Sequence, residues 1–281
     1  MTDPIVSTAW LASRLNDHTI KMIDATWFMP GEARDSKAEF AAGHIPGAVF
    51  FDIDALSDLT SNLPHMLPTA AQFSENVTAL GLSNQDTIVV YDSHGLFSAA
   101  RAWWTLRVMG HRAVYVLDGG LPRWRAEGRP LETGMPAPAT GHFYAALDPT
   151  LVRDIDQVSD LLRNGAEQIV DVRSAARFEG QAPEPRAGIR GGHMPGAINL
   201  PFGDLIAEGG LKPRAALLET LAGAGVYPER PLTASCGTGV TASVLALAMA
   251  RVGLCDAAVY DGSWTEWGGR SDTPVVTGPA G

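Results

Sequence analysis

Short hydrophobic runs alternate with helical patterns along the whole chain. In the first half, residues 88–91 and 113–117 are continuous hydrophobic runs with the length of a buried strand. Residues 69–80 and 97–109 instead repeat hydrophobic positions at helical spacing, and each of these patterns ends directly before a glycine. This order predicts helices placed between strands, which is typical of parallel sheets.

The second half shows the same alternation. Strands are predicted at 168–172, 232–235 and 257–260, and helices around 158–162, around 217–221 and up to residue 252. Strands that are hydrophobic throughout are covered on both faces. We therefore predict an α/β fold in which each half is a mostly parallel sheet flanked by helices on both faces. Ligands of such sheets bind at the carboxyl ends of the strands.

A sequence motif occurs once in each half. Gly-His-x-Pro-Gly-Ala stands at residues 43–48 and again at 192–197, and a hydrophobic run ending in Asp24 or Asp171 precedes each copy. Each half then closes with an Asp-Gly motif followed by tryptophan, at residues 118–124 and 261–267. The conserved order of three features predicts two tandem copies of one duplicated domain.

The length agrees with two domains, because 281 residues is about twice the common domain size of roughly 100–150. Residues 129–141 hold three prolines and two glycines without a hydrophobic period, which indicates a semi-extended linker. We expect an N-terminal domain at 1–128, a linker at 129–142 and a C-terminal domain at 143–281.

Composition excludes several classes of protein. Hydrophobic residues make up 46% of the chain and charged residues 19%, which excludes intrinsic disorder. The formal net charge of −10 disfavours nucleic acid as a partner. The longest strongly hydrophobic run, residues 242–250, is too short to span a membrane, and residues 1–4 do not begin a signal peptide. We expect a cytoplasmic protein that does not associate with membranes.

The chain has two cysteines, Cys236 and Cys255. They are too few for a disulfide framework or a structural zinc site, so we expect a reducing compartment and no metal. We expect no organic cofactor either, because the chain lacks a nucleotide-binding fingerprint.

The loop Cys236-Gly237-Thr238-Gly239-Val240-Thr241 joins a predicted strand to a predicted helix. Its glycines allow a tight curl that turns N–H groups inward, and the helix start directs positive charge to the same point. A cysteine at the base of this loop is expected to be a reactive thiolate. The alternative is a small, buried structural cysteine.

Two thiolate chemistries use such a loop. A cysteine phosphatase needs an arginine six residues after the nucleophile to bind phosphoryl oxygens, and that position is Ala242. The remaining chemistry is sulfur transfer, in which the thiolate takes up a sulfur atom and the loop N–H groups stabilise its charge.

With these motifs the chain resembles the two-domain sulfurtransferases of the rhodanese superfamily over nearly its whole length. The loop at 236–241 is more similar to the 3-mercaptopyruvate branch than to the thiosulfate branch. In the thiosulfate branch the two residues after the cysteine are typically Arg and Lys, whereas this chain has the uncharged Gly237 and Thr238.

The resemblance implies roles for further residues. Arg177 and Arg186 match the two substrate-binding arginines of the family, and Thr238 takes the place of its catalytic serine. His65 and Asp54 match the partners of that serine in a proton relay. The alternative for His65 and Asp54 is that they only hold the domain interface.

Several other residues are expected to be structural. When the strand ends of the two halves are aligned, Asp92 takes the position of Cys236. The first domain therefore resembles the non-catalytic copy of the family. His44 and His193 occur in both halves and are expected to tie turns. We expect Arg190 at the surface and Cys255 to be packed or partly exposed.

Three functional hypotheses follow. The first is transfer of sulfur from 3-mercaptopyruvate through a persulfide on Cys236 to a thiol, cyanide or a thioredoxin-like acceptor, with release of pyruvate. The second is an enzyme of the same class that prefers thiosulfate. The third is a sulfur-carrier or sensing module that holds a persulfide for a protein partner.

Overall fold

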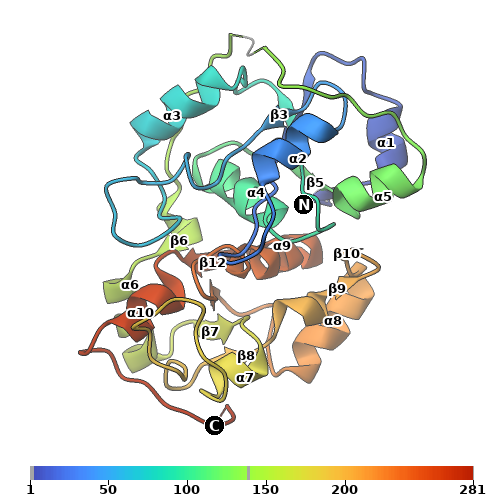
Figure 1. Cartoon of the computed structure of the whole chain (residues 1–281). Helices are drawn as coiled ribbons and strands as arrows, with labels where there is room; N and C mark the ends of the chain where they lie inside the picture. The colour runs from blue at the N-terminus through green and yellow to red at the C-terminus, as the bar shows by residue number, and fades with distance from the viewer. Residues whose placement is uncertain (1–2, 138–139, 281) are drawn as a thin grey trace.

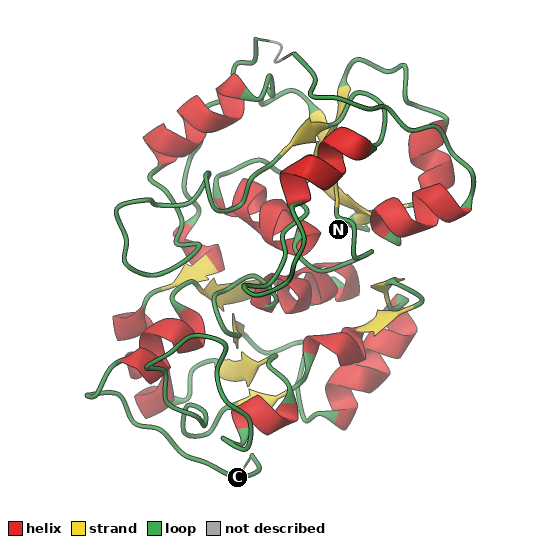
Figure 2. Ribbon diagram, in the orientation of Figure 1, coloured by secondary structure: helices red, strands yellow, loops and turns green. Residues whose placement is uncertain are grey.

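The structure is a computed structural model that describes residues 3–137 and 140–280. Residues 1–2 and 281, at the ends of the predicted domains, and residues 138–139 of the predicted linker lie outside the described residues. Each half of the chain forms a five-stranded sheet, and the two halves lie one above the other in Figures 1 and 2.

The two sheets have the same strand order, and every strand pairing within them is parallel. The first sheet runs β1 (Ile5–Val6), β5 (Val114–Leu117), β4 (Thr87–Tyr91), β2 (Ile20–Asp24) and β3 (Val49–Phe50). The second runs β6 (Val152–Arg153), β12 (Ala257–Tyr260), β11 (Leu232–Ser235), β7 (Gln168–Asp171) and β8 (Ile198–Asn199). The predicted α/β fold and its duplication are confirmed, while the boundaries at 128 and 143 stay predictions.

Helices cover both faces of each sheet (Figure 2). The first half has α1 (Thr8–Ala12), α2 (Ser36–Ala42), α3 (Ala70–Ala79), α4 (Ala99–Val108) and α5 (Gly120–Ala126). The second half has α6 (Ile155–Asn164), α7 (Ala175–Phe178), α8 (Arg214–Gly223), α9 (Ala242–Val252) and α10 (Ser263–Gly269), with 3₁₀ turns η1 (Pro149–Leu151) and η2 (Phe202–Leu205). An antiparallel hairpin, β9 (Ile206–Ala207) and β10 (Gly210–Leu211), follows η2.

The helix predicted from residue 97 begins two residues later, at Ala99. The buried carboxylate of Asp92 satisfies N–H groups at this helix start, because it accepts hydrogen bonds from the N–H groups of Phe97 and Ala99. The short helices α1, α2, α5, α7 and α10 were not predicted, since helices of four to seven residues carry too few periods for a pattern.

One hydrophobic core passes through both halves. It includes Trp103 and Trp104 of α4 together with Leu245 and Leu247 of α9, and these two helices pack side by side where the halves meet (Figure 1). All residues of α4 except Arg107, and all residues of α9 except Arg251, are buried. A helix that is buried all round fixes its neighbours firmly. No helix in the described ranges has the length and hydrophobicity needed to cross a membrane.

The equivalent aspartates at the ends of β2 and β7 differ in their electrostatic surroundings. Asp171 is fully buried and pairs with Arg173, whereas Asp24 accepts hydrogen bonds from the backbone and hydroxyl of Thr26 and from the Tyr91 hydroxyl, and has no ion pair within the described residues. Burial therefore raises the pKa of Asp24 from 3.8 to about 6, and the nearby charge of Asp92 acts in the same direction. Ionised Asp24 is destabilising in the folded protein.

We expect Asp24→Asn to stabilise the protein in a pH-dependent way. Because the folded-state pKa is raised, the native protein loses stability as pH rises from about 4 to about 6, by about 3 kcal/mol. The substitution should therefore raise the free energy of unfolding at pH 7.5 but not at pH 4, measured by urea denaturation. The matched variant Asp171→Asn should instead lower the free energy of unfolding, because it removes one of the two carboxylates that pair with the buried Arg173. An equal effect of Asp24→Asn at both pH values would contradict this account.

Candidate active site

Cys236 lies at the carboxyl end of β11, the central strand of the second sheet, and is only 2% exposed. Its carbonyl oxygen accepts a hydrogen bond from Trp264 N at 2.9 Å, and the carbonyl of Gly237 accepts from Thr265 N at 2.9 Å and Thr265 Oγ1 at 2.8 Å. In a trans peptide the N–H points away from the preceding carbonyl. Because α10 binds these two carbonyls, the N–H groups of Gly237 and Thr238 point away from α10.

The loop N–H groups have no protein partner. Those of residues 237–241 donate to no backbone or side-chain group in the described part of the chain. The N-terminus of the eleven-residue helix α9 follows directly. Uncommitted N–H groups and a helix N-terminus in one place form a cradle for an anion.

The two loop glycines are required for different reasons. Gly239 has φ +79°, and a Cβ there would lie 2.7 Å from Arg101 Nη1. Gly237 is not in the left-handed region, but a Cβ there would lie 3.2 Å from Arg177 Nη2. The predicted tight curl therefore rests on Gly239, whereas Gly237 lets an arginine approach the loop closely.

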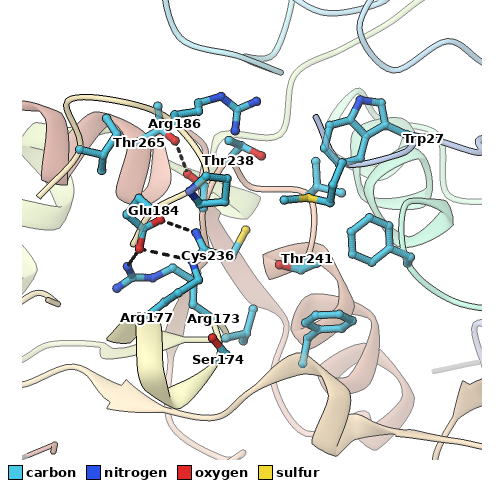
Figure 3. A pocket seen from close by; sticks show the side chains of 18 residues that line it. Trp27, Arg173, Ser174, Arg177, Glu184, Arg186, Cys236, Thr238, Thr241 and Thr265 are labelled. Carbon is cyan, nitrogen blue, oxygen red and sulfur yellow. Dashed lines mark hydrogen bonds and ion pairs between the residues drawn. The ribbon is translucent and has the colours of Figure 1, made fainter. Parts of the chain in front are cut away.

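A cavity of about 310 Å³ opens above Cys236 between the two halves. Figure 3 shows the sulfur of Cys236 between Trp27 on one side and the pair of Arg177 and Glu184 on the other. The apolar wall continues with Met29 and with Phe97, Ile189 and Phe202, so both halves contribute to it. The cavity combines an apolar wall, a charged wall and a nucleophile at its base.

Arg177 and Arg186, the predicted substrate-binding residues, both line the cavity, but their surroundings differ. Arg177 pairs with the buried carboxylate of Glu184, which also binds Arg173 Nη1 at 2.8 Å. Arg186 makes no ion pair or hydrogen bond within residues 3–137 and 140–280. Burial, and secondarily the charge of Arg177, lowers the pKa of Arg186, while Asp54 and Cys236 act in the opposite direction. An arginine nevertheless stays protonated in proteins, so Arg186 is the cation available to a bound anion.

The predicted relay residues are brought together from distant parts of the chain. His65 is buried, and its Nδ1 lies 3.0 Å from Thr238 Oγ1 while its Nε2 lies 2.9 Å from Asp54 Oδ1. Trp27 Nε1 donates to Asp54 Oδ2 at 3.0 Å, and its ring meets the His65 ring edge-on at 4.9 Å. The hydrogen bond from His65 is the main cause that lowers the pKa of Asp54. An ionised carboxylate therefore orients the imidazole toward the Thr238 hydroxyl.

Sequence reasoning missed two supporting groups. Glu184 joins Arg177 to the buried Arg173. Arg101 pairs with Asp261 across the interface at 2.7 Å. A signal for Arg101 existed, because it is the one charged residue among the alanines and tryptophans at 99–104.

The corresponding loop of the first half is filled by its own side chain. Asp92 Oδ1 accepts from His94 N at 2.9 Å, and Oδ2 accepts from Phe97 N at 2.7 Å and Ala99 N at 2.8 Å. A carboxylate thus occupies the anion cradle that Cys236 leaves open in the second half.

The repeated histidines lie away from the cavity. His44 Nδ1 is 2.8 Å from the carbonyl of Phe40, and His193 Nδ1 is 2.9 Å from that of Phe178. The His44 ring also stacks on the Phe40 ring with centroids 4.0 Å apart, and the His193 ring stacks on the Phe178 ring with centroids 3.6 Å apart. These contacts tie turns, in agreement with the structural role predicted for both residues.

Arg190 was wrongly predicted to be a surface charge. It is half-buried and donates to the carbonyls of Trp267, Gly268 and Thr273, so it holds the segment after α10 in place. Cys255 is half-buried, and burial raises its pKa.

Comparison with known proteins agrees with this geometry. A profile of the rhodanese-like domain matches residues 7–127 and 154–270. The 3-mercaptopyruvate sulfurtransferase of Escherichia coli K12 is 45% identical over 271 residues, covering 96% of each chain. The mitochondrial thiosulfate/3-mercaptopyruvate sulfurtransferase 1 of Arabidopsis thaliana is 43% identical over 296 residues, covering 98% of this chain and 78% of the relative. The crystal structure of the Escherichia coli 3-mercaptopyruvate sulfotransferase SseA superposes with a TM-score of 0.87 at 42% identity, covering 94% of this chain and 99% of the other. With both halves matched, the chain belongs to the rhodanese family.

Proposed function

We propose that the protein is a sulfurtransferase that takes sulfur from 3-mercaptopyruvate, holds it as a persulfide on Cys236 and passes it to a nucleophilic acceptor. The main support is the position of Cys236 at the base of a cradle of uncommitted N–H groups, facing Arg186 across one cavity. The names and identities of the relatives support the same donor.

The donor carries a carboxylate, a ketone and a thiol, and the cavity offers a partner for the carboxylate and for the sulfur. Arg186 can bind the carboxylate in bidentate fashion without breaking an ion pair. The three-carbon chain then brings the sulfur toward Cys236. The apolar wall that includes Trp27 excludes water from this region.

Sulfur transfer needs one nucleophilic substitution and one proton. The Cys236 thiolate attacks the donor sulfur, the carbon–sulfur bond breaks, and its electron pair forms the enolate of pyruvate. The proton lost by the donor thiol passes through the Thr238 hydroxyl to His65 and returns to the enolate carbon. The products are pyruvate and a Cys236 persulfide anion, which the N–H groups of Gly237, Thr238, Gly239, Val240 and Thr241 stabilise.

In the second step an acceptor thiolate or cyanide attacks the outer sulfur and releases the Cys236 thiolate. We propose a small thiol or a thioredoxin-like protein as the acceptor. Both cysteines are free thiols, which favours a reducing compartment such as the cytoplasm, although the Arabidopsis relative is named as mitochondrial.

Thiosulfate is the second candidate donor, because the name of the Arabidopsis relative includes both substrates. A dianion needs two available cations, whereas Glu184 already binds Arg177. The charge of the cavity therefore favours the monoanionic 3-mercaptopyruvate.

We expect Cys236→Ser to abolish pyruvate release from 3-mercaptopyruvate, while Cys255→Ser keeps the wild-type rate because its thiol lies outside the cavity. The rates are measured with a small thiol as acceptor. Wild-type turnover by Cys236→Ser would refute the proposal. A higher kcat/KM with thiosulfate than with 3-mercaptopyruvate would reverse the choice of donor, and no turnover without a protein partner would favour a carrier module.

Arg186→Ala should raise KM for 3-mercaptopyruvate more than Arg177→Ala does. A hydrogen-bonded charge pair is worth about 1.5–3 kcal/mol, which corresponds to roughly tenfold to a hundredfold in KM. The effect of Arg177→Ala should be smaller because Glu184 already neutralises this cation. Steady-state kinetics of both variants test this order. An unchanged KM in both would show that the carboxylate is bound elsewhere.

Thr238→Val should slow persulfide formation by about a hundredfold, because it keeps the shape of the side chain but removes the hydroxyl that faces His65. Thr238→Ser, which keeps the hydroxyl, should retain most of the rate. Stopped-flow measurement of the first turnover gives both values. If Thr238→Val reacts as fast as Thr238→Ser, the hydroxyl does not carry a proton.

A further inference from the structure

His65 has an unusual backbone conformation. Its φ is +62°, and only two other non-glycine residues of the described chain, Glu208 and Ser263, have positive φ. The left-handed region costs a residue with a Cβ of order 1–3 kcal/mol, so the surroundings must hold it there. The segment that follows β3 therefore needs a restraint that determines the position of the His65 ring.

Arg101 and Asp261 provide this restraint. Arg101 Nη2 donates to the His65 carbonyl and, at 2.7 Å, to Asp261 Oδ1. The other oxygen of Asp261 accepts from Leu67 N at 2.7 Å. The pair is buried, with 3% and 6% of the two side chains exposed. One ion pair thus binds the backbone on both sides of the turn that begins at His65.

The first half contains a similar arrangement. Arg123 pairs with Asp118, the aspartate of its Asp-Gly motif, and Arg123 Nη2 donates to the carbonyl of Glu208 at 3.1 Å. Glu208 also has positive φ, +51°, and lies in the β9–β10 turn contributed by the second half. A Cβ on Gly95 would clash with the carbonyl oxygen of Gly209, so this turn packs directly against the first-half loop.

In both cases an arginine paired with a motif aspartate binds the carbonyl of a left-handed residue, and the aspartate and that residue come from different halves. Arg123 lies in the same half as its aspartate, whereas Arg101 lies in the same half as His65. At the first-half loop the left-handed residue is Glu208, which the second half supplies, and Asp92 already fills the cradle there. At the second-half loop it is His65, which faces Thr238. The shared element is an arginine–aspartate pair that holds the carbonyl of a left-handed residue at the contact between the two halves.

We propose that Arg101, held by Asp261, is a positioning residue that fixes His65 in its left-handed conformation and so places the imidazole between Asp54 and Thr238. The inference rests on the proposed relay. Arg101 does not line the cavity and acts only through His65. A direct effect on the loop is the competing explanation, because Arg101 Nη1 is buried without a partner in the described chain and lies beside Gly239.

The test measures the first turnover with 3-mercaptopyruvate, across a pH series, for Arg101→Met, His65→Ala and the double variant. Misplacement of a reacting group by about 1 Å can cost about a hundredfold. We expect Arg101→Met to lose roughly tenfold to a hundredfold in kcat with KM nearly unchanged, and to show the same altered pH profile as His65→Ala. The double variant should be no slower than His65→Ala alone.

Matched controls separate positioning from loss of an ion pair. Arg107, also on α4, bonds Asp256 of the second half at 3.3 Å and lies over a tryptophan ring, as Arg101 does. Arg107→Met and Arg123→Met should keep the wild-type rate and pH profile. If Arg101→Met does not fold, Asp261→Asn, which keeps the shape of the side chain, carries the same expectation.

Each other outcome contradicts a definite part of the account. A wild-type rate for Arg101→Met with a slow His65→Ala refutes the positioning role and leaves the relay intact. Losses that multiply in the double variant show that Arg101 acts on the loop directly, which also refutes it. A wild-type rate for both single variants refutes relay and positioning together, while persulfide formation on Cys236 remains testable through Cys236→Ser.

Discussion

The packing of α4 against α9 is the constraint on which the site depends. Each helix begins directly after the loop at the carboxyl end of the central strand of its sheet, β4 or β11, so their contact brings the two loops and their neighbouring segments together. Both helices lie in one hydrophobic core that is continuous between the halves. Because the core is close-packed, the halves cannot shift relative to each other without large cost. The cavity that both halves line therefore keeps a fixed shape.

The two halves carry equivalent cradles of N–H groups, one filled by a side chain and one left open. In the first half the carboxylate of Asp92 accepts three backbone hydrogen bonds and satisfies the loop internally. In the second half the side chain at the strand end is a thiol, and the loop N–H groups remain available to a negative charge formed during reaction. Electrostatic catalysis usually depends on hydrogen-bond donors that are in place before the negative charge develops.

Much of this organisation could be predicted from the sequence. Continuous hydrophobic runs predicted the central strands nearly to the residue, and the repeated motifs predicted the duplication. The loop at 236–241 followed from local chemistry, whereas His65 and Asp54 came only from resemblance, since no local pattern links residues so far from Cys236. The pairing of Arg177 with Glu184 and the buried place of Arg190 were not predictable, because the partner of a charged side chain is decided by tertiary packing. Arg101 was missed for the same reason, although its apolar surroundings in the sequence marked it as unusual.

The central claim is that Cys236 carries the transferred sulfur. The most direct measurement is the mass of the intact protein after reaction with 3-mercaptopyruvate in the absence of an acceptor, followed by peptide mapping. We predict a gain of one sulfur atom per chain, located on the peptide that contains Cys236, and an equal amount of pyruvate. Pyruvate release without added sulfur on the protein, or a sulfur atom found on Cys255, would contradict it.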